Sequence, residues 1–239
     1  FSQRGYKKFI AYFQSFSNTY APKEKLEEIY SSVLDFPEII GIAIGTRPDC
    51  INEEVINLLK HFQSLGYYLW VELGLQTIHN ETLKKINRGH TYEEFVEAYQ
   101  LLKENGIPLC IHLIFGLPGE DKEMMLETVK SVAALLPHGI KFHALYIIKE
   151  APIARLYENQ TFKLLTLEEY ADLVATSLAM LPPNTVVHRL TSDPPKDSLI
   201  APLWLLEKHK VLQSIHQKMK EKDLYQGKNF RSKNNFRGN

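Results

Sequence analysis

Polar and conformationally special residues gather where the predicted strands of this chain end. In the stretch IHLIFGLPGED, residues 111–121, a mostly apolar run meets the turn Gly116-Leu117-Pro118-Gly119, and two acids follow. Glycines let a ligand approach the backbone closely, and proline fixes the direction of a turn. Many loops carry glycine and proline for turn geometry alone, and this stretch by itself leaves both interpretations open.

Five other predicted strands end in segments that can be read in the same way. In parallel α/β folds, ligands bind at the carboxyl ends of the strands. Most of these ends are rich in small or polar residues, which favours a binding face there. The segments are QSFSNTY (14–20), GTRPD (45–49), LGLQT (73–77), IIKEAP (147–152) and HRLTSDPP (188–195).

Strands that alternate with helices must position these ends. The predicted strands are residues 9–13, 39–45, 68–75, 108–116, 139–148 and 185–190, and the predicted helices between them are 21–36, 53–66, 91–106, 122–136 and one that begins at 166. This βαβ pattern predicts an α/β fold with a parallel sheet and helices outside it. An open or partial barrel or a doubly wound sheet would fit, whereas a closed eight-stranded barrel needs two more strands.

Local signals predict where several helices begin. Asn52 can cap one helix, and Thr91 with Glu94 and Thr166 with Glu169 have the spacing of capping boxes. We expect a core over residues 1–190, a proline-rich loop and a long helix (about 198–221) within residues 191–225, and a disordered basic tail over residues 226–239.

Composition limits the classes of partner. The chain has 239 residues, and its 28 basic and 28 acidic residues cancel, which argues against a dominant nucleic-acid or membrane field but not against a local patch. Cys50 and Cys110 are its two cysteines, so no disulfide framework is implied and a reducing cytoplasm fits. We find neither a signal peptide nor an apolar run near the roughly 20 residues of a membrane span, and expect a cytoplasmic protein without a membrane partner.

Several motifs in a fixed order resemble the core of the radical SAM enzymes. They are WVELGLQT (70–77), INRGHTYEEFVEAYQLLKENGI (86–107) and IHLIFGLPGED (111–121). They look most like the group that holds elongator-type tRNA modifiers, methylthiotransferases and oxygen-independent coproporphyrinogen oxidases. IGTRPD (44–49) resembles the group's third-strand motif, and AYFQSFSNTYAP (11–22) with VHRLTSDPP (187–195) looks like the YhcC-type subgroup.

The resemblance implies a partial (β/α)6, TIM-like barrel and an enzyme that uses S-adenosylmethionine and a 4Fe-4S cluster. In the family a Cys-x3-Cys-x2-Cys loop after the first strand holds the cluster, and Cys50 and Cys110 cannot form it. Strand 9–13 matches the family's second strand, so we expect the first strand and the cysteine loop to lie before Phe1. One alternative is a cluster-free module of this fold that binds nucleotide or RNA. Another, an aldolase-type barrel, is disfavoured because Lys141 lies at the wrong end of its strand for a Schiff base.

The resemblance also implies a cofactor site spread over the strand ends. It implies that Gln76 contacts the ribose, because its amide offers both a donor and an acceptor to the two ribose hydroxyls. It implies that Arg88 binds the methionine carboxylate, whose geometry suits a planar guanidinium. His112 stands where relatives use an Asp on the ribose, and Glu120 reads as a helix-start acid. The full expected cofactor set is Gln14, Ser15, Ser17, Thr46, Gln76, Arg88, His112, Ile114, Gly116 and Leu117.

Candidate substrate residues lie on the late predicted strands, and two more lie at the end of the second strand and in the third strand. Arg47 and Glu72 lie on adjacent predicted strands and could form a buried ion pair or bind substrate. The remaining candidates are His143, His188 and Arg189. The resemblance leaves the substrate open, with tRNA a candidate because several relatives modify it, and implies an electron donor such as flavodoxin or ferredoxin.

Overall fold

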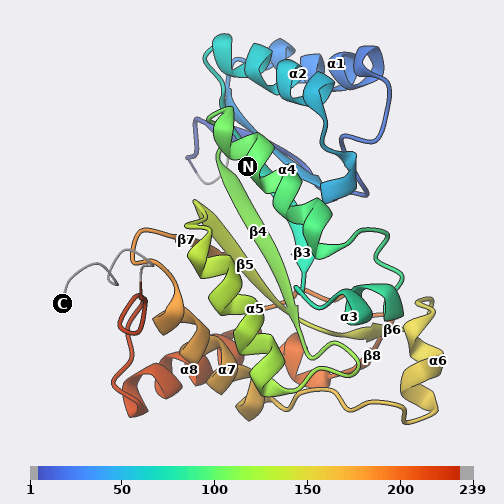
Figure 1. Cartoon of the computed structure of the whole chain (residues 1–239), viewed down its shortest axis with the longest axis vertical. Helices are drawn as coiled ribbons and strands as arrows, with labels where there is room; N and C mark the ends of the chain where they lie inside the picture. Colours follow the sequence, from blue (N-terminus) through green and yellow to red (C-terminus); the bar gives the residue numbers. More distant parts are fainter. Residues whose placement is uncertain (1–4, 232–239) are drawn as a thin grey trace. The chain divides into compact units, whose positions relative to one another are not determined.

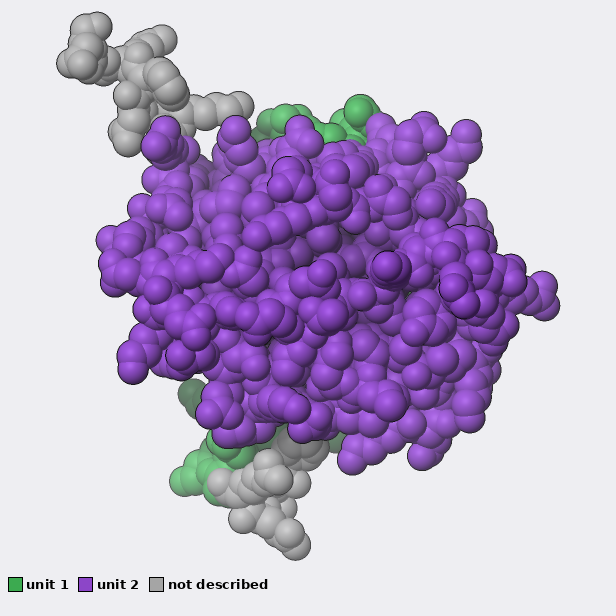
Figure 2. All heavy atoms as spheres, turned by 90° about the horizontal axis from the view of Figure 1, so that it is seen from below, with its two compact units in different colours: residues 1–75, 90–111 green, residues 76–89, 112–239 purple. Residues whose placement is uncertain are grey.

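The computed structural model describes residues 5–231 and divides the chain into two compact units (Figures 1 and 2). Unit 1 comprises residues 1–75 and 90–111, and unit 2 comprises residues 76–89 and 112–239. Each unit is described by itself below.

Six strands begin at or within one residue of the positions that the apolar runs predicted. The sheet has the order β1-β2-β3-β4-β5-β7, in which β1 and β2, β2 and β3, and β5 and β7 pair in parallel. The strands are β1 (Phe9–Phe13), β2 (Ile39–Thr46), β3 (Tyr68–Gln76), β4 (Leu109–Phe115), β5 (Gly139–Ala144) and β7 (Val186–Arg189). The predicted α/β class with parallel strands is therefore confirmed.

In unit 1, apolar helix faces cover the strands. Tyr30 of α1 and Phe62 of α2 are both almost fully buried, and their rings meet edge to face at 5.9 Å. The side chain of Asn52 accepts a hydrogen bond from the Val55 N–H at 3.0 Å, so the predicted cap of α2 is confirmed. The unit's helices are α1 (Lys23–Ser31), α2 (Glu53–Ser64) and α4 (Tyr92–Glu104), with short 3-10 helices η2 (Ser32–Asp35) and η3 (Pro48–Cys50).

In unit 2, α7 is the central helix and contacts both α5 and α8. Its Tyr170 is fully buried, 6.3 Å from Phe115, whose ring stacks on Phe142 at 5.3 Å. This aromatic cluster holds β4, β5 and α7 together. The helices are α3 (Asn80–Lys85), α5 (Lys122–Ala134), α6 (Ile153–Glu158), α7 (Leu167–Met180) and α8 (Lys208–Glu221), with the 3-10 helix η4 (Leu203–Leu206).

The predicted C-terminal helix is wrong in its first ten residues. Leu199–Ala201 form strand β8, which pairs antiparallel with β6 (Ile147–Ile148), and α8 begins only at Lys208. Pro202 explains the difference, because proline lacks the N–H that a helix interior needs and disfavours helical backbone in the residue before it. The predicted strand 139–148 is also two strands in the structure, β5 and β6, with Leu145 and Tyr146 between them.

Part of the predicted disordered tail has a defined place. The Gln226 side chain donates to the carbonyls of Pro182 and Thr185 at 3.0 and 2.7 Å, and Asn229 N–H donates to Ala179 O at 2.8 Å. These bonds attach the segment to the end of α7. Residues 232–239 lie outside the described part. Over the described residues, no helix is both long and apolar enough to cross a membrane.

Both predicted capping boxes are present, and that of α7 can be tested. The Thr166 hydroxyl accepts from Glu169 N–H at 3.2 Å, and the Glu169 carboxylate accepts from Thr166 N–H at 2.8 Å. We expect Thr166→Ala to lower the free energy of unfolding by about 1 kcal/mol, as for other caps. Urea denaturation should show a smaller loss for Thr166→Ser, which keeps the hydroxyl; equal losses would contradict the capping role.

The same box predicts a dependence of stability on pH. Hydrogen bonds from the N–H and the hydroxyl of Thr166 lower the pKa of the Glu169 carboxyl. The stabilising effect of the ionised Glu169 carboxylate should therefore be complete above the carboxyl's pKa in the unfolded chain, about 4.3. It should be lost as the pH falls through the lower pKa of the folded state. We expect the stability difference between wild type and Glu169→Ala to be constant from pH 7 to about 5 and to shrink below about 4. In a Thr166→Ala background this acid dependence should be weaker.

Candidate functional site

Unit 2 contains a pocket of about 300 Å³ at the carboxyl ends of its strands. Three of the predicted cofactor residues line it, together with His143 from the predicted substrate set. The imidazoles of His112 and His143 lie on β4 and β5 with their centroids 5.3 Å apart. The lining residues are Gln76, His112, Ile114, His143, Ala144, Leu145, Tyr146 and Ser192.

Gln76 ends β3 in a backbone conformation that is uncommon for its residue type. Its φ is 75°, in the left-handed region, where a Cβ is close to the following carbonyl. Residues in such regions persist only where the surroundings hold them, and they cluster at functional sites. The half-buried Gln76 side chain lines the pocket, so the unusual backbone coincides with the position for which sequence predicted a ligand contact.

Buried hydroxyls follow Gln76 in the chain. Thr77 is fully buried, and its oxygen lies 3.3 Å from that of Thr128 on α5. Ile78 N–H donates to the Thr128 hydroxyl at 3.4 Å, and the Nε2 atom of His79 lies 3.0 Å from the carbonyl of Met124. These contacts fasten the turn between β3 and α3 to α5.

The Gly116–Gly119 turn has a different environment from the one that sequence predicted. Gly116 has φ 88°, and a Cβ there would lie 3.2 Å from Leu165 Cγ, so a protein side chain fills the space beside it. Leu117 is buried in the core. Gly119 instead borders a separate pocket of about 440 Å³ with Lys84 and Lys85. Ile114 is thus the part of the expected adenine segment that lines the pocket with Gln76.

Loop contacts from the last strands complete the pocket of unit 2. The buried Ser192 hydroxyl donates to Ala144 O at 2.8 Å, and Leu145 N–H donates to Phe115 O at 2.9 Å. Sequence reasoning missed Ala144, Leu145, Tyr146 and Ser192 as pocket residues. The available signal was their place at the end of β5 or in the loops after β5 and β7, where ligands bind in parallel sheets.

Three other predicted residues of unit 2 do not line this pocket. Arg88 is half-buried in the turn after α3, where its N–H donates to Leu83 O at 2.9 Å. His188 is exposed on β7, and Arg189 lies 3.6 Å from Asp193 in a partly exposed ion pair.

In unit 1, side chains tie the ends of β1 and β2 together. The Asn18 amide donates to Phe13 O at 3.0 Å and to Gly45 O at 2.9 Å. The buried hydroxyls of Thr19 and Thr46 lie 2.6 Å apart, and Thr19 also donates to Cys50 O at 2.7 Å. Because Thr19 gives its proton to the carbonyl, Thr46 must donate to Thr19. The predicted cofactor residue Thr46 is thus engaged in a buried structural bond.

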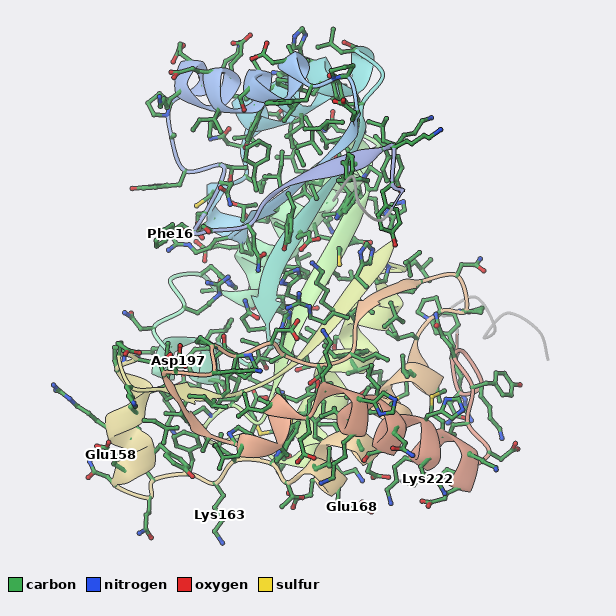
Figure 3. All side chains as sticks on the ribbon, turned by 180° about the vertical axis from the view of Figure 1, so that it is seen from behind. Phe16, Glu158, Lys163, Glu168, Asp197 and Lys222 are labelled. Atoms are coloured by element: carbon green, nitrogen blue, oxygen red, sulfur yellow. The ribbon has the colours of Figure 1, made fainter. Side chains whose placement is uncertain are left out.

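The loop after β1 is open to solvent. Gln14 and Ser15 are exposed, and Ser17 is half-buried. Phe16, labelled in Figure 3, is 98% exposed and has φ 64°. Burial raises the pKa of the Cys50 thiol, which disfavours the thiolate that metal binding requires.

Arg47 and Glu72 do not form the buried ion pair that was one of the two possibilities left open by the sequence. The Arg47 guanidinium makes a two-pronged pair with Asp49, with Nε 2.9 Å from Oδ1. Burial opposes ionisation of Asp49, but the hydrogen bond and charge of Arg47 outweigh it and lower the pKa of this carboxyl. Glu72 is buried and accepts from Tyr12 at 2.5 Å and from Trp70 at 3.1 Å. Arg47 directly follows β2, and its guanidinium pairs with Asp49, two residues further along the chain, which is the nearer carboxylate in sequence.

His90 is a buried residue that sequence reasoning did not single out for a role. Its Nε2 lies 3.0 Å from Gly74 O, and its Nδ1 lies 3.1 Å from Thr91 O. The imidazole therefore connects the end of β3 with the start of α4. The motif INRGH contained it, but no local pattern indicated this long-range partner.

Comparisons with known proteins identify the class. The Radical SAM superfamily model matches residues 1–132, and a Radical_SAM C-terminal domain matches residues 137–221. The YtqA protein of Bacillus subtilis is 44% identical over 93% of this chain and 69% of its own length. Protein YhcC of Escherichia coli is 37% identical over 83% of this chain, which spans 64% of that relative. A tRNA uridine(34) acetyltransferase of Methanocaldococcus jannaschii is 29% identical over 67% of this chain and 30% of its length.

Solved structures share the fold. Elp3 of Methanocaldococcus infernus superimposes with a TM-score of 0.81 at 24% identity, over 94% of this chain and 57% of that one. Coproporphyrinogen III oxidase HemN of Escherichia coli, a radical SAM enzyme, gives 0.52 at 20% identity, over 68% and 37%. The fold is thus the parallel-stranded α/β partial barrel of radical SAM proteins. The chain belongs to the radical SAM superfamily, as its motifs predicted.

The cysteines of this sequence do not fit the cluster that is typical of the superfamily. Cys50 and Cys110 are both buried and are the two cysteines of the sequence, whereas a cluster held by three thiolates needs three cysteines that reach one another. A three-thiolate cluster therefore requires ligands that the 239 residues do not contain.

The left-handed backbone of Gln76 predicts an unusual order of stabilities. Glycine adopts φ 75° without a Cβ conflict, so Gln76→Gly should be more stable than Gln76→Ala by about 1 kcal/mol. Urea denaturation of the two variants measures this difference. Gln217 in α8 is the matched control. There the Ala variant should be more stable than the Gly variant by a similar free energy of unfolding. Equal free energies of unfolding for Gln76→Ala and Gln76→Gly would contradict a strained backbone at this position.

Proposed function

We propose that this chain forms the S-adenosylmethionine-binding core of a radical SAM enzyme. Such an enzyme cleaves S-adenosylmethionine reductively at a 4Fe-4S cluster and uses the resulting 5′-deoxyadenosyl radical on its substrate. The observation that carries the proposal is the unit 2 pocket, in which Gln76, His112 and Ile114 meet at the strand ends. Membership of the superfamily supports it.

The lining residues fit the adenosine part of the cofactor. A pocket near 300 Å³ is at the lower end of the range for small-molecule sites. The Gln76 amide can donate to one ribose hydroxyl and accept from the other. The apolar Ile114 offers a surface for the flat face of adenine, and the His112 imidazole can bond the sugar or the base edge. The strand ends thus bind and orient the cofactor, and the radical chemistry belongs to the cluster and the cofactor.

The other end of the pocket is the proposed place for substrate. His143, Tyr146 and Ser192 contribute polar groups there, from β5 and the loops after β5 and β7. These groups suit a polar substrate that exposes hydrogen-bonding edges. We propose tRNA as the substrate class to test first, because a similar chain is named as a tRNA uridine(34) acetyltransferase. A flavodoxin or ferredoxin is the proposed electron donor.

Binding of the cofactor's adenosine part is the first test. S-adenosylhomocysteine serves as the probe, because it carries the adenosine and lacks the reactive sulfonium. Gln76→Ala removes neutral hydrogen bonds, each worth on the order of 1 kcal/mol, so we expect Kd to rise roughly fivefold in isothermal titration calorimetry. Gln217→Ala, which truncates the exposed Gln217 on α8, should bind like wild type. A wild-type chain that does not bind the probe would contradict the site.

Reductive cleavage tests the enzyme assignment itself. The protein expressed from its intact gene should bind iron and sulfide under anaerobic reconstitution and release 5′-deoxyadenosine slowly from S-adenosylmethionine after reduction with dithionite. Chromatography measures the product. Gln76→Ala should lower turnover but leave iron content unchanged, because Gln76 does not ligate iron. A protein that binds the probe but no cluster would instead favour a cluster-free module that binds nucleotide or RNA.

A further inference from the structure

The loop that follows β7 is bonded to the wall of the unit 2 pocket. The last residues that pair in the parallel ladder of β5 and β7 are Lys141 and Arg189. Three residues beyond each of them, the Ser192 hydroxyl donates to Ala144 O at 2.8 Å. A side chain thus extends the contact between the two segments beyond the end of their backbone ladder.

Burial makes this hydrogen bond matter. Ser192 is 1% exposed and Ala144 is 3% exposed, so water does not compete for either group. A serine hydroxyl has a single proton, and here that proton is given to the carbonyl. A buried acceptor that loses its donor bears the cost of its desolvation. Removal of the Ser192 hydroxyl should therefore loosen the peptide that carries the Ala144 carbonyl.

The same peptide is bonded on its other side to β4. Leu145 N–H donates to Phe115 O at 2.9 Å. The carbonyl of Ala144 and the N–H of Leu145 belong to one peptide group, and in a trans peptide they point in opposite directions. The bonds from Ser192 and to Phe115 therefore fix the plane of this peptide. Ala144, Leu145 and the following Tyr146 all line the pocket.

Tyr170 of α7 holds the loop that carries Ser192. Its hydroxyl donates to Leu190 O at 2.9 Å, and its side chain is fully buried. The intervening Thr191 is 1% exposed, but its hydroxyl oxygen has no hydrogen-bond partner among the described residues. Two adjacent hydroxyls are thus equally buried, and only that of Ser192 has a bond in the described part of the chain. This difference provides a matched comparison.

We infer that Ser192 is a positioning residue for the unit 2 pocket and that it acts by fixing the peptide between Ala144 and Leu145. The orientation of this peptide decides where three lining residues lie. A binding site keeps its geometry when supporting hydrogen bonds hold the residues that line it. The inference rests on the proposed function, because a fixed wall affects cofactor binding only if the pocket takes the cofactor.

Hydrogen exchange tests the role of the bond without any ligand. Ser192→Ala removes the donor, so we expect backbone amides in the segment 142–148, which contains Leu145, to exchange roughly fivefold faster. Mass spectrometry of peptides that cover the segment measures the rate. Thr191→Val is the matched control, because it removes the neighbouring hydroxyl and should leave this exchange unchanged. Unchanged exchange in Ser192→Ala would overturn the inference.

Binding of S-adenosylhomocysteine tests whether the fixed peptide matters for the pocket. We expect Ser192→Ala to raise Kd roughly fivefold in isothermal titration calorimetry, and Ser192→Thr, which keeps the hydroxyl, to stay closer to wild type. Ser177→Ala is a second control, because it removes a fully buried hydroxyl that donates to Leu173 O at 2.7 Å within α7. It should lower the melting temperature without changing Kd.

Failure of the inference and failure of the proposed function give different results. A wild type without affinity for the probe contradicts the proposed function, and the cofactor-binding role of Ser192 falls with it. A wild type that binds, with a Gln76→Ala variant that loses affinity and a Ser192→Ala variant that does not, contradicts the inference alone. Equal losses in Ser192→Ala and Ser177→Ala would indicate general destabilisation and would also overturn it.

Thermal unfolding of each variant, with and without the probe, shows that the measured protein is folded. If Ser192→Thr does not fold because of its added methyl group, the comparison of Ser192→Ala with Thr191→Val and Ser177→Ala still decides.

Discussion

Backbone carbonyl groups at the carboxyl ends of the strands need hydrogen-bond donors, and this need shapes both units. Where parallel strands diverge into loops, the ladder no longer supplies a donor, and a buried carbonyl without one has a cost. In unit 1 the Asn18 amide serves the carbonyls of Phe13 and Gly45. In unit 2 the Ser192 hydroxyl serves Ala144 O, and the Leu145 N–H serves Phe115 O. The loops that form the pocket are therefore held by the same bonds that complete the strands.

Much of the fold could be predicted because its signals are local. Apolar runs mark the strands, and the spacing of Thr166 and Glu169 marks the start of α7 within one helical turn. The missed features depend on competition between local signals. Helical periodicity after Ser198 outweighed a single proline in our prediction, whereas Pro202 and the pairing of β8 with β6 decide the outcome in the structure. The end of the tail was assigned by composition, which does not indicate that Gln226 meets three carbonyl groups near the end of α7.

The candidate site was predictable in part. Strand ends follow from the strands, so Gln76, His112 and Ile114 could be placed near one pocket without knowledge of their contacts. Side-chain direction could not be read in the same way. Leu165, far along the chain, fills the space beside Gly116, and Arg47 pairs with Asp49, whereas an ion pair with Glu72 was one of the two possibilities that the sequence left open. Such outcomes depend on partners distant in sequence or on rotamers, for which a single sequence carries no pattern.

The left-handed backbone at residue 76 places two demands on one position that no single amino acid meets fully. Glycine and asparagine are the residues that tolerate this conformation best, but glycine has no side chain and asparagine is one methylene shorter than glutamine. Under the proposed function, in which Gln76 contacts the cofactor, stability and ligand contact therefore select in opposite directions there. Random substitutions screened for heat resistance alone would enrich variants that are firmer at this turn and poorer in binding, the usual trade at a functional site. Stabilisation of this chain should begin at positions such as the helix caps, where both demands agree.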